Sequence, residues 1–411
     1  MRENRSDIVI IGSGLAGLSA LIAARTANPD RSAVLLEKKK RPGGKIPVAG
    51  SGQCNITHSG SPQSFLSKYG EKNRFVKPAL FQYPNSFLID FLQQRGVPLE
   101  EEENGKIFPC SRKSADVLNA FVREIHALGG KIVCDSPVSH FDLQNGEFVI
   151  HTESEIWRAE KLLLATGGIS WPGTGSTGDA FPWLEKIGHT IVPLRPALTS
   201  LIINPWSYAS CSGISFHSDR IELIRNEKRI RTLTGEILLT HTGLSGPGIL
   251  DGSRYMEPND KLLITLVPFR SREEFEVRFL NDLRQFSARE VQSIVRQYNL
   301  PERLVHEIFR SVRIPLESRG AEFSKENRKK LIDRLFSFPC EIRAKDGFEK
   351  AMCTAGGVDL SEADPKTMMS RIVPNLYFGG EILDIDGDTG GFNLQFAFSS
   401  GSLAGHHMGN A

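Results

Sequence analysis

Residues 8–37 read IVIIGSGLAGLSALIAARTANPDRSAVLLE, and their order decides the fold. A continuous apolar run, Ile8–Ile11, leads into a glycine-rich turn. A stretch rich in Ala and Leu follows, as a helix leaving a tight turn would be, and a second apolar run at residues 34–36 ends at Glu37. A strand, a helix and a strand within about thirty residues predict one half of a doubly wound α/β fold.

The turn at residues 12–17 reads GSGLAG, which is the pattern GxGxxG. Gly12 permits the tight turn, Gly14 lets a pyrophosphate approach the backbone, and Gly17 lets helix and strand pack closely. Free N–H groups and the helix dipole favour negative charge at this end of the helix. Glu37 can accept hydrogen bonds from ribose hydroxyls, which disfavours a 2′-phosphate. Because all these parts stand in register, the segment predicts dinucleotide binding rather than a glycine-rich turn of an unrelated domain.

A long glycine-rich loop follows the second strand. Residues 38–45 read KKKRPGGK and residues 50–57 read GSGQCNIT, with more glycine than a strand or helix tolerates. Backbone N–H groups and short polar side chains in such a loop can wrap a flavin. We therefore predict FAD rather than NAD as the dinucleotide, with a flexible surface linker as the alternative.

Two further glycine-rich stretches accompany this loop. Residues 165–179, ATGGISWPGTGSTGD, contain a second GxGxxG at Gly173, Gly175 and Gly178. Pro172 precedes it and no strand enters it directly, so it predicts a loop over the cofactor or substrate. Residues 379–395, GGEILDIDGDTGGFNLQ, place acids and a glycine pair before a helix. The start of that helix, near Asn393, is expected to face the flavin pyrimidine, where negative charge develops on reduction.

The remaining pattern divides the chain into two parts. At 411 residues it exceeds what one ordinary hydrophobic core supports. Strands at 138–143 and 148–152 joined by an Asn145-Gly146 turn, and another at 162–165, suit a small antiparallel meander that returns to the main sheet. From about residue 193 short β-type runs come first and helices follow; from 346 glycine-rich strand and helix character returns. We predict an α/β class fold with a Rossmann-like domain at 1–192 and 346–411, and an insert at 193–345 that is β-type at 193–270 and helical at 271–345.

Several local signals place helix ends. Ser114 as N-cap and Gly129-Gly130 as stop bound a helix, and a second helix is expected at 392–404. Within the insert, Ser271-x-x-Glu274 and Ser287-x-x-Glu290 have the spacing of capping boxes.

The composition narrows the class of protein. No apolar run could cross a bilayer and no signal-peptide pattern precedes the first strand, so we expect a cytoplasmic protein that does not bind membranes. The six cysteines lack metal-ligand spacing, and Asp384, Asp386 and Asp388 lack the pattern of an EF-hand; no metal site is predicted. Residues 191–345 hold 25 Lys and Arg against 19 Asp and Glu, an excess of +6, which fits an ordinary surface or one that meets RNA.

The chain resembles the flavoprotein family that includes the BaiN, RdsA and aminoacetone-oxidase-like proteins. The resemblance rests on GSGLAG (12–17), GSGQCNIT (50–57), ATGGISWPGTGSTGDA (165–180), LTHTGLSGPGIL (239–250) and the tail from AMCTAGGVDLSEADPKTMMSR (351–371) to GGEILDIDGDTGGFNLQFAFSSGSLAG (379–405). It implies a Rossmann-like FAD domain interrupted by an insert with a β-barrel and a helical part. It also implies non-covalent FAD contacts at Gly12, Gly14, Gly17, Glu37, Lys38, Gly44, Lys45, Asn55, Val138, Gly380, Glu381, Asn393 and Leu394. We add to these, as candidate FAD-binding neighbours in the same motifs, Ser13, Ala16, Gly52, Ala165, Thr166, Gly167, Asp386 and Gly391.

One departure from the family pattern concerns the charge of the second loop. The family commonly reads GRCN where this chain has Gly52-Gln53-Cys54-Asn55, so a cation expected near the flavin or substrate is missing.

The family's activities diverge, and three reactions stay open. They are reduction of a carbon–carbon double bond conjugated to a carbonyl, reduction of uridine in ribosomal RNA, and oxidation of an amino ketone, all by hydride transfer at flavin N5. Our leading hypothesis is reduction of a small conjugated alkene, with His241 as the acid and Cys54 and Ser170 as further candidates. With no second complete Rossmann unit, the electron donor is either NAD(P)H bound transiently or a partner protein. The oligomeric state is left open.

Overall fold

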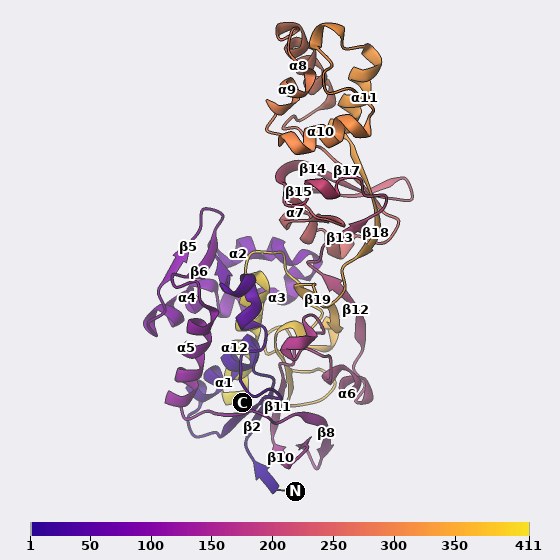
Figure 1. Ribbon diagram of the computed structural model, residues 1–411. Coiled ribbons are helices and arrows are strands. Elements are labelled where there is room, and N and C mark those ends of the chain that lie inside the picture. Colours follow the sequence, from indigo (N-terminus) through magenta and orange to yellow (C-terminus); the bar gives the residue numbers. More distant parts are fainter. Residues whose placement is uncertain (1, 411) are drawn as a thin grey trace. The chain divides into compact units, whose positions relative to one another are not determined.

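The computed structural model describes residues 2–410, which fold as two compact units (Figure 1). The first unit comprises Met1–Pro196 and Ala351–Ala411, and the second comprises Ala197–Lys350. Each unit has its own cluster of buried apolar side chains. The first unit is therefore made from segments at both sides of the inserted second unit.

A five-stranded parallel sheet forms the centre of the first unit. The strands are β2 (Ile8–Ile11), β3 (Ala33–Leu36), β7 (Lys131–Val133), β11 (Lys161–Leu164) and β20 (Leu376–Phe378), in the spatial order β20-β11-β2-β3-β7. The continuous apolar runs of β2, β3 and β11 are buried throughout, as strands covered on both faces require. Helix α1 (Leu15–Ala27) connects β2 to β3, so the predicted Rossmann-like βαβ unit is confirmed.

Smaller sheets surround the parallel one. The meander has the order β1-β10-β9-β8, with strands β1 (Arg2–Arg5), β8 (Val138–Gln144), β9 (Glu147–Thr152) and β10 (Glu155–Ala159). Asn145 and Gly146 have φ values of 52° and 84° in the turn between β8 and β9, as the Asn-Gly signal predicts. The charged lead at Arg2–Arg5, which the sequence interpretation left without structure, pairs in parallel with β10.

The other elements of the first unit are short strands and six more helices. The strands are β4 (Thr57–His58), β5 (Leu99–Glu101) and β6 (Lys106–Pro109) in one sheet and β12 (Ile191–Ala197) with β19 (Cys353–Val358) in another. The helices are α2 (Pro62–Phe65), α3 (Asn73–Gln82), α4 (Asn85–Gln94), α5 (Ser114–Ala127), α6 (Ala180–Lys186) and α12 (Phe392–Asn410).

Helices α1 and α12 touch through their backbones. Gly401, Gly405 and Gly409 recur every four residues and so share one face of α12. A Cβ atom on Gly401 or Gly405 would overlap the carbonyl oxygen of Ala16 or Ala20 of α1. Only glycine permits this separation, and α12 thereby fixes the position of α1.

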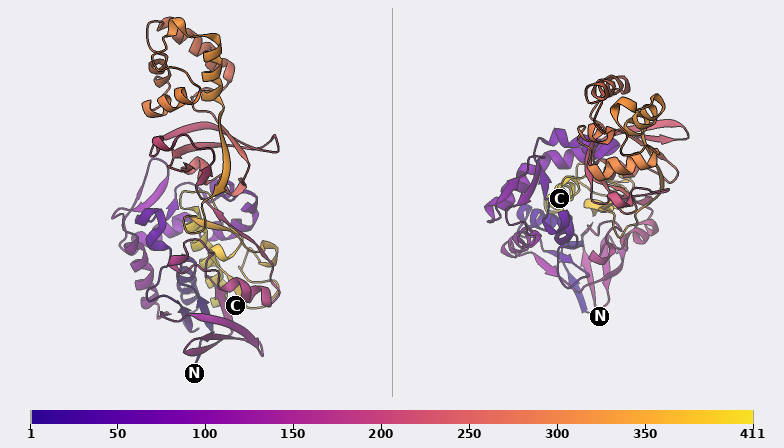
Figure 2. Two further views of the ribbon diagram at one scale, coloured as in Figure 1. Left: turned by 45° about the vertical axis from the view of Figure 1, so that its right-hand side comes forward. Right: turned by 45° about the horizontal axis from the view of Figure 1, so that its top comes forward.

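The second unit joins a closed barrel to a group of helices. The barrel order is β13-β16-β15-β14-β17-β18, with strands β13 (Leu201–Ile203), β14 (Ser215–Arg225), β15 (Lys228–Leu239), β16 (Gly243–Ser245), β17 (Lys261–Ile264) and β18 (Phe338–Lys345). The helices are α7 (Pro247–Leu250), α8 (Arg272–Gln285), α9 (Val291–Arg296), α10 (Glu302–Ser311) and α11 (Lys325–Phe336). The expected insert with a β-barrel and a helical part is confirmed, and Figure 2 shows α8–α11 gathered on one side of the barrel. The barrel is closed by β18, which follows these helices and lies in the range 271–345 that was predicted as helical.

Two predicted helix caps, at Ser114 and Ser287, are wrong. In each case a segment distant in sequence forms a hydrogen bond with the serine. Ser114 is the first residue of α5 rather than its cap, and its hydroxyl donates to the Pro47 carbonyl (3.4 Å). Ser287 and Glu290 form no capping box. The Ser287 carbonyl accepts the Ala321 N–H (2.8 Å), and the backbones of Glu290 and Arg319 pair in an isolated antiparallel β-bridge. By contrast, Ser271 does cap α8 through the Glu274 N–H (3.1 Å).

Two further expectations concern the cysteines and the helices. All six cysteines are free thiols, and four of them are buried, as expected for small apolar side chains. Over residues 2–410, no helix combines the length and apolar character needed to cross a bilayer.

The α1–α12 contact predicts a reversal of the usual helix preference. Alanine in place of a helical glycine normally stabilises by about 0.5–1 kcal/mol, but Gly405→Ala should destabilise, by about 1–3 kcal/mol, because the methyl group meets the α1 backbone. Urea unfolding monitored by circular dichroism measures the change. The exposed neighbour His406→Ala is the control and should change stability by less than about 0.5 kcal/mol. A more stable Gly405→Ala protein would contradict the packing described.

Candidate functional site

Three loops meet at the carboxyl edge of the parallel sheet. The Gly12 N–H donates to the Leu36 carbonyl and the Ala165 N–H to the Ile11 carbonyl, both at 2.9 Å. The Gly379 N–H donates to the Leu164 carbonyl at 3.0 Å. These bonds extend the strand ladder and bring the turn at 12–17, the loop from 165 and the loop from 379 side by side. Open α/β sheets bind ligands at this edge.

The glycines of the first turn have distinct surroundings that match their predicted roles. Gly12 has φ 102°, and a Cβ there would lie 2.5 Å from the Ala165 carbonyl oxygen. A Cβ on Gly17 would overlap the Gly12 carbonyl oxygen. Gly14 has no atom within 4 Å of the place where its Cβ would be. Gly12 and Gly17 are thus required by the fold, whereas Gly14 leaves open space.

The start of α1 borders this open space. Gly14 is the N-cap, no side chain caps the helix, and no acidic residue lies in its first turn. The first N–H groups of a helix lack intrahelical acceptors, so they and the helix dipole can bind an anion here. The local structure therefore suits a phosphate group beside Gly14.

Glu37 lies buried next to the turn and is already hydrogen-bonded. Its Oε2 accepts the Ser13 N–H (3.0 Å) and the Ser13 hydroxyl, and its Oε1 accepts the Lys39 N–H (2.8 Å). Ser13 also accepts the Gly43 N–H, at its carbonyl and at its hydroxyl. A carboxylate has about four acceptor positions, so about one remains for a ribose hydroxyl unless Ser13 rotates. The predicted ribose contact of Glu37 stays a prediction.

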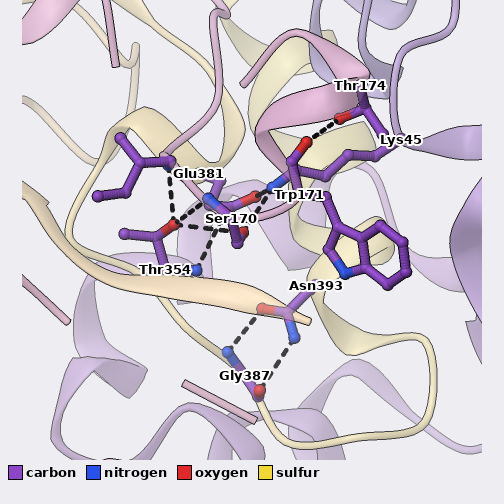
Figure 3. A network of polar contacts seen from close by, with 9 residues as sticks. Lys45, Ser170, Trp171, Thr174, Thr354, Glu381, Gly387 and Asn393 are labelled. Carbon is purple, nitrogen blue, oxygen red and sulfur yellow. Dashed lines mark hydrogen bonds and ion pairs between the residues drawn. The ribbon is translucent and has the colours of Figure 1, made fainter. Parts of the chain in front are cut away.

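Hydrogen bonds connect several charged and hydroxyl-bearing side chains of the first unit in one network (Figure 3). The Lys45 ammonium donates to Glu381 Oε2 (2.6 Å) and to Ser170 Oγ (2.8 Å). The Ser170 hydroxyl donates in turn to Glu381 Oε1 (2.9 Å). Ser170 is wholly buried, while the side chains of Lys45 and Glu381 each keep 21% of their exposure. The network joins loops that follow β3, β11 and β20.

Thr354 belongs to this network and was missed from the sequence. Its buried hydroxyl oxygen accepts the N–H groups of Ile169 (2.9 Å) and Ser170 (3.1 Å). Its own N–H donates to Glu381 Oε1 (2.7 Å). The signal that could have identified it is a polar residue within the otherwise apolar strand β19, shortly before the pair Gly356-Gly357.

The acidic loop before α12 pairs with two lysine side chains. Lys72 Nζ lies 2.6 Å from Asp384 and 2.9 Å from Asp386, and Lys68 lies 3.8 Å from Asp388. The Asn393 side chain holds the loop by accepting the Gly387 N–H (2.8 Å) and donating to the Gly387 carbonyl (2.9 Å), as Figure 3 shows.

The remaining candidate cofactor residues lie in the first unit. The Ser136 N–H donates to the Glu37 carbonyl (2.9 Å), which brings the start of β8 at Val138 near Glu37. Lys38 donates to Asp179 (2.6 Å) and to Thr177, so it holds the loop at 165–179, which is irregular apart from one short turn, as expected. The others occupy loop or helix-start positions: Gly44, Gly52, Asn55, Thr166, Gly167, Gly380, Gly391 and Leu394.

A cation does contact the second loop, although Gln53 is neutral. Arg112 Nη1 donates to Gln53 Oε1 at 3.3 Å. The same guanidinium pairs with Glu100 and Glu102, which neutralise its charge.

The three candidate acids differ in exposure. Cys54 is fully buried, and burial raises the pKa of its thiol to about 12, so it stays protonated and out of reach of solvent. The Ser170 hydroxyl is engaged in the Lys45 network. His241 lies in the second unit and is exposed in the bend between β15 and β16.

Comparison with known proteins agrees with this fold. The model of the HI0933-like protein Rossmann domain matches residues 6–407. A Haemophilus influenzae protein named ribosomal RNA dihydrouridine synthase is 32% identical over 407 residues, covering 96% of each chain. A Clostridium scindens protein named 3-dehydro-bile acid delta(4,6)-reductase is 28% identical over 404 residues, covering 97% of this chain and 98% of its own. The crystal structure of a Rhodococcus jostii 3-ketosteroid-delta4-(5alpha)-dehydrogenase shares the fold, with a TM-score of 0.53 and 15% identity over 100% of this chain and 97% of that one. The chain belongs to the HI0933-like family of Rossmann-domain proteins.

Proposed function

We propose that this chain is an FAD-dependent oxidoreductase that reduces a carbon–carbon double bond conjugated to a carbonyl group. The observation that carries the proposal is the turn at 12–17, where Gly14 faces open space at the uncapped start of α1. The names of the two relatives support the reaction class, since both describe the reduction of such a bond.

The residues present fit FAD at the carboxyl edge. The diphosphate would lie against the N–H groups that follow Gly14, and Glu37 would hold the adjoining ribose. Lys45, with two of its three N–H donors directed to Ser170 and Glu381, would provide positive charge at the flavin end.

The chemistry divides between the cofactor and the protein. Bound in its reduced form, the flavin would supply the hydride for the β-carbon of the substrate and return to oxidised FAD, and the electron donor would then reduce it again. The protein must supply a proton to the α-carbon, from a group that can be protonated again by solvent. His241 is exposed, whereas Cys54 and Ser170 are fully buried, so we retain His241 as the proposed acid.

Uridine and a keto-steroid are chemically alike at the bond in question. The C5–C6 double bond of uracil is conjugated to the C4 carbonyl, and dihydrouridine is the product of its saturation. One catalytic arrangement can therefore serve either substrate class, and surfaces away from the reacting bond would select between them.

A basic hairpin in the second unit favours ribosomal RNA as the second candidate substrate. The far half of the β14–β15 hairpin extends from the barrel (Figure 2), and Lys228–Thr232 are all exposed. Lys228 and Arg231 have no carboxylate partner among residues 2–410. The Arg231 guanidinium lies over the Tyr255 ring, with 3.8 Å between its Cζ atom and the ring centroid. Exposed cations on a projecting β-ribbon suit phosphate contacts. The helix-borne Arg328, Lys329 and Lys330 are the other basic group, although Lys330 pairs with Glu326 (2.6 Å).

The cofactor assignment predicts a protein that binds one FAD per chain and loses it on Gly14→Val. The backbone at Gly14 (φ −64°, ψ 176°) accepts valine, so stability should fall by only about 1 kcal/mol while the added side chain blocks the diphosphate. Flavin released by acid and quantified by absorbance gives the occupancy. Thr26→Val, in the last turn of the same helix, is the control. Full flavin content in Gly14→Val would refute this site.

The acid assignment predicts a slower chemical step without loss of cofactor. After anaerobic reduction with NADH, NADPH or dithionite, reoxidation by a conjugated enone should slow by about 10²–10⁴-fold in His241→Ala, with unchanged flavin content. His217→Ala removes another exposed histidine of the same unit and should have no effect. Equal rates in the wild type and His241→Ala would remove His241 from the mechanism.

The RNA hypothesis predicts a charge-dependent affinity located on the hairpin. Neutralising Lys228, Arg229 and Arg231 to Gln should weaken binding of ribosomal RNA and reduce the salt slope by about 2–3, at about 0.7–0.9 per phosphate contact. Reoxidation by a small enone should be unaffected. The matched triple change of Arg328, Lys329 and Lys330 to Gln distinguishes hairpin from helix. Wild-type protein that neither binds ribosomal RNA at low salt nor is reoxidised by it would exclude this substrate.

A further inference from the structure

Two histidines face each other across the β8–β9 hairpin in the first unit. The two-residue turn at Asn145-Gly146 sets the register, so that His140 pairs directly with His151. Asp142 follows His140 by two residues and therefore lies on the same face of the sheet. The hairpin thus gathers two imidazoles and one carboxylate, none of which the candidate cofactor site uses.

The imidazole nitrogens and the carboxylate oxygens of this group lie close together. Asp142 Oδ2 lies 3.7 Å from His140 Nε2 and 3.5 Å from His151 Nε2, and the three atoms all lie within 4.8 Å of one another. Ligands bound tetrahedrally at about 2.0–2.2 Å from a zinc ion lie about 3.4 Å apart. The spacing of the three atoms is thus close to that of zinc ligands, and the two stacked rings must turn out of their parallel arrangement so that both Nε2 lone pairs point at one ion.

Ser139 determines which nitrogen of His140 is available. A β-bulge between Val138 and His140 brings the Ser139 hydroxyl to 3.0 Å from His140 Nδ1. That hydroxyl already donates its hydrogen to the His151 carbonyl (3.2 Å). With its hydrogen directed at that carbonyl, the hydroxyl can accept a hydrogen from His140 Nδ1, and in this tautomer of His140 the Nε2 lone pair is available to a metal ion. This is the outer-shell arrangement that prepares a histidine for a metal.

The second histidine reinforces the inference. His151 Nε2 is buried from solvent and makes no hydrogen bond within residues 2–410; the Asp142 oxygen lies 3.5 Å away. The two imidazole rings stack with centroids 4.3 Å apart and planes 5° apart. A metal ion at this position would give the buried His151 Nε2 the partner that it lacks.

We propose that His140, Asp142 and His151 form a binding site for a divalent transition-metal ion, with zinc as the reference ion. Imidazole ligands favour zinc, copper or nickel over magnesium or calcium. Because Asp142 and His140 keep nearly half of their side-chain exposure, water would complete the coordination. The bound ion would cross-link β8 to β9. Strand β8 begins at Val138, close to Glu37 of the candidate cofactor site.

Zinc titration of the tag-free, flavin-loaded protein at neutral pH tests the site. Isothermal titration calorimetry should give one zinc per chain, and metal analysis after dialysis should agree. His151→Ala and Asp142→Asn, neither of which alters the buried core, should weaken binding by at least about 100-fold, and Ser139→Ala by about 10-fold. Zinc should raise the unfolding temperature of the wild type and leave that of His151→Ala unchanged.

The His217–Asp219 pair on β14 provides a matched control. It has the same two-residue spacing, with 3.3 Å between Nε2 and Oδ1, but no third ligand side chain within the described part of the chain joins it. His217→Ala should therefore bind zinc like the wild type. The proposal is overturned if the wild type binds no zinc at roughly 100 µM, well above the dissociation constant of a micromolar site. Equal zinc binding by His151→Ala and the wild type would overturn it as well.

Discussion

Backbone contact between α1 and α12 is the constraint on which the first unit depends. The start of α1 can face an anion only if the helix is held against the sheet at a fixed position. Gly17 sets the distance to the turn at Gly12, and the glycine face of α12 holds α1 from the other side. Close packing of this kind tolerates no extra methyl group, so the geometry of the turn also depends on glycines of α12 that are not among the candidate cofactor contacts.

The fold was predictable where the signals were local. The βαβ unit, the Asn-Gly hairpin and the Ser271 cap each depend on residues within about thirty positions of one another, and the structure contains all three. The caps at Ser114 and Ser287 failed because Pro47 and Ala321, distant in sequence, take their place as hydrogen-bond partners. Propensity alone cannot anticipate such competition.

The candidate site was predictable in part. Lys45, Ser170 and Glu381 stood out by their motifs, but their connection through Thr354 joins four segments and could not be derived from spacing. The histidine pair of the hairpin is a different case. With the Asn145-Gly146 turn identified, counting outward from it pairs residue 144 with 147 and, without interruption, residue 140 with 151, so most of this information was already in the sequence. A search for metal ligands by the short spacing of Cys and His motifs passes over such a cross-strand arrangement.

The position of α12 late in the sequence also determines when, during synthesis, the turn at 12–17 can reach its final geometry. Helix α1 leaves the ribosome long before the glycine face that fixes it and before the strand β20 that lies beside β11. The barrel and its helices can fold around their own core in the interval. Translation that stops before residue 376 yields a βαβ segment that lacks both β20 and the glycine face of α12, so the proposed dinucleotide site would be complete only after α12 is made.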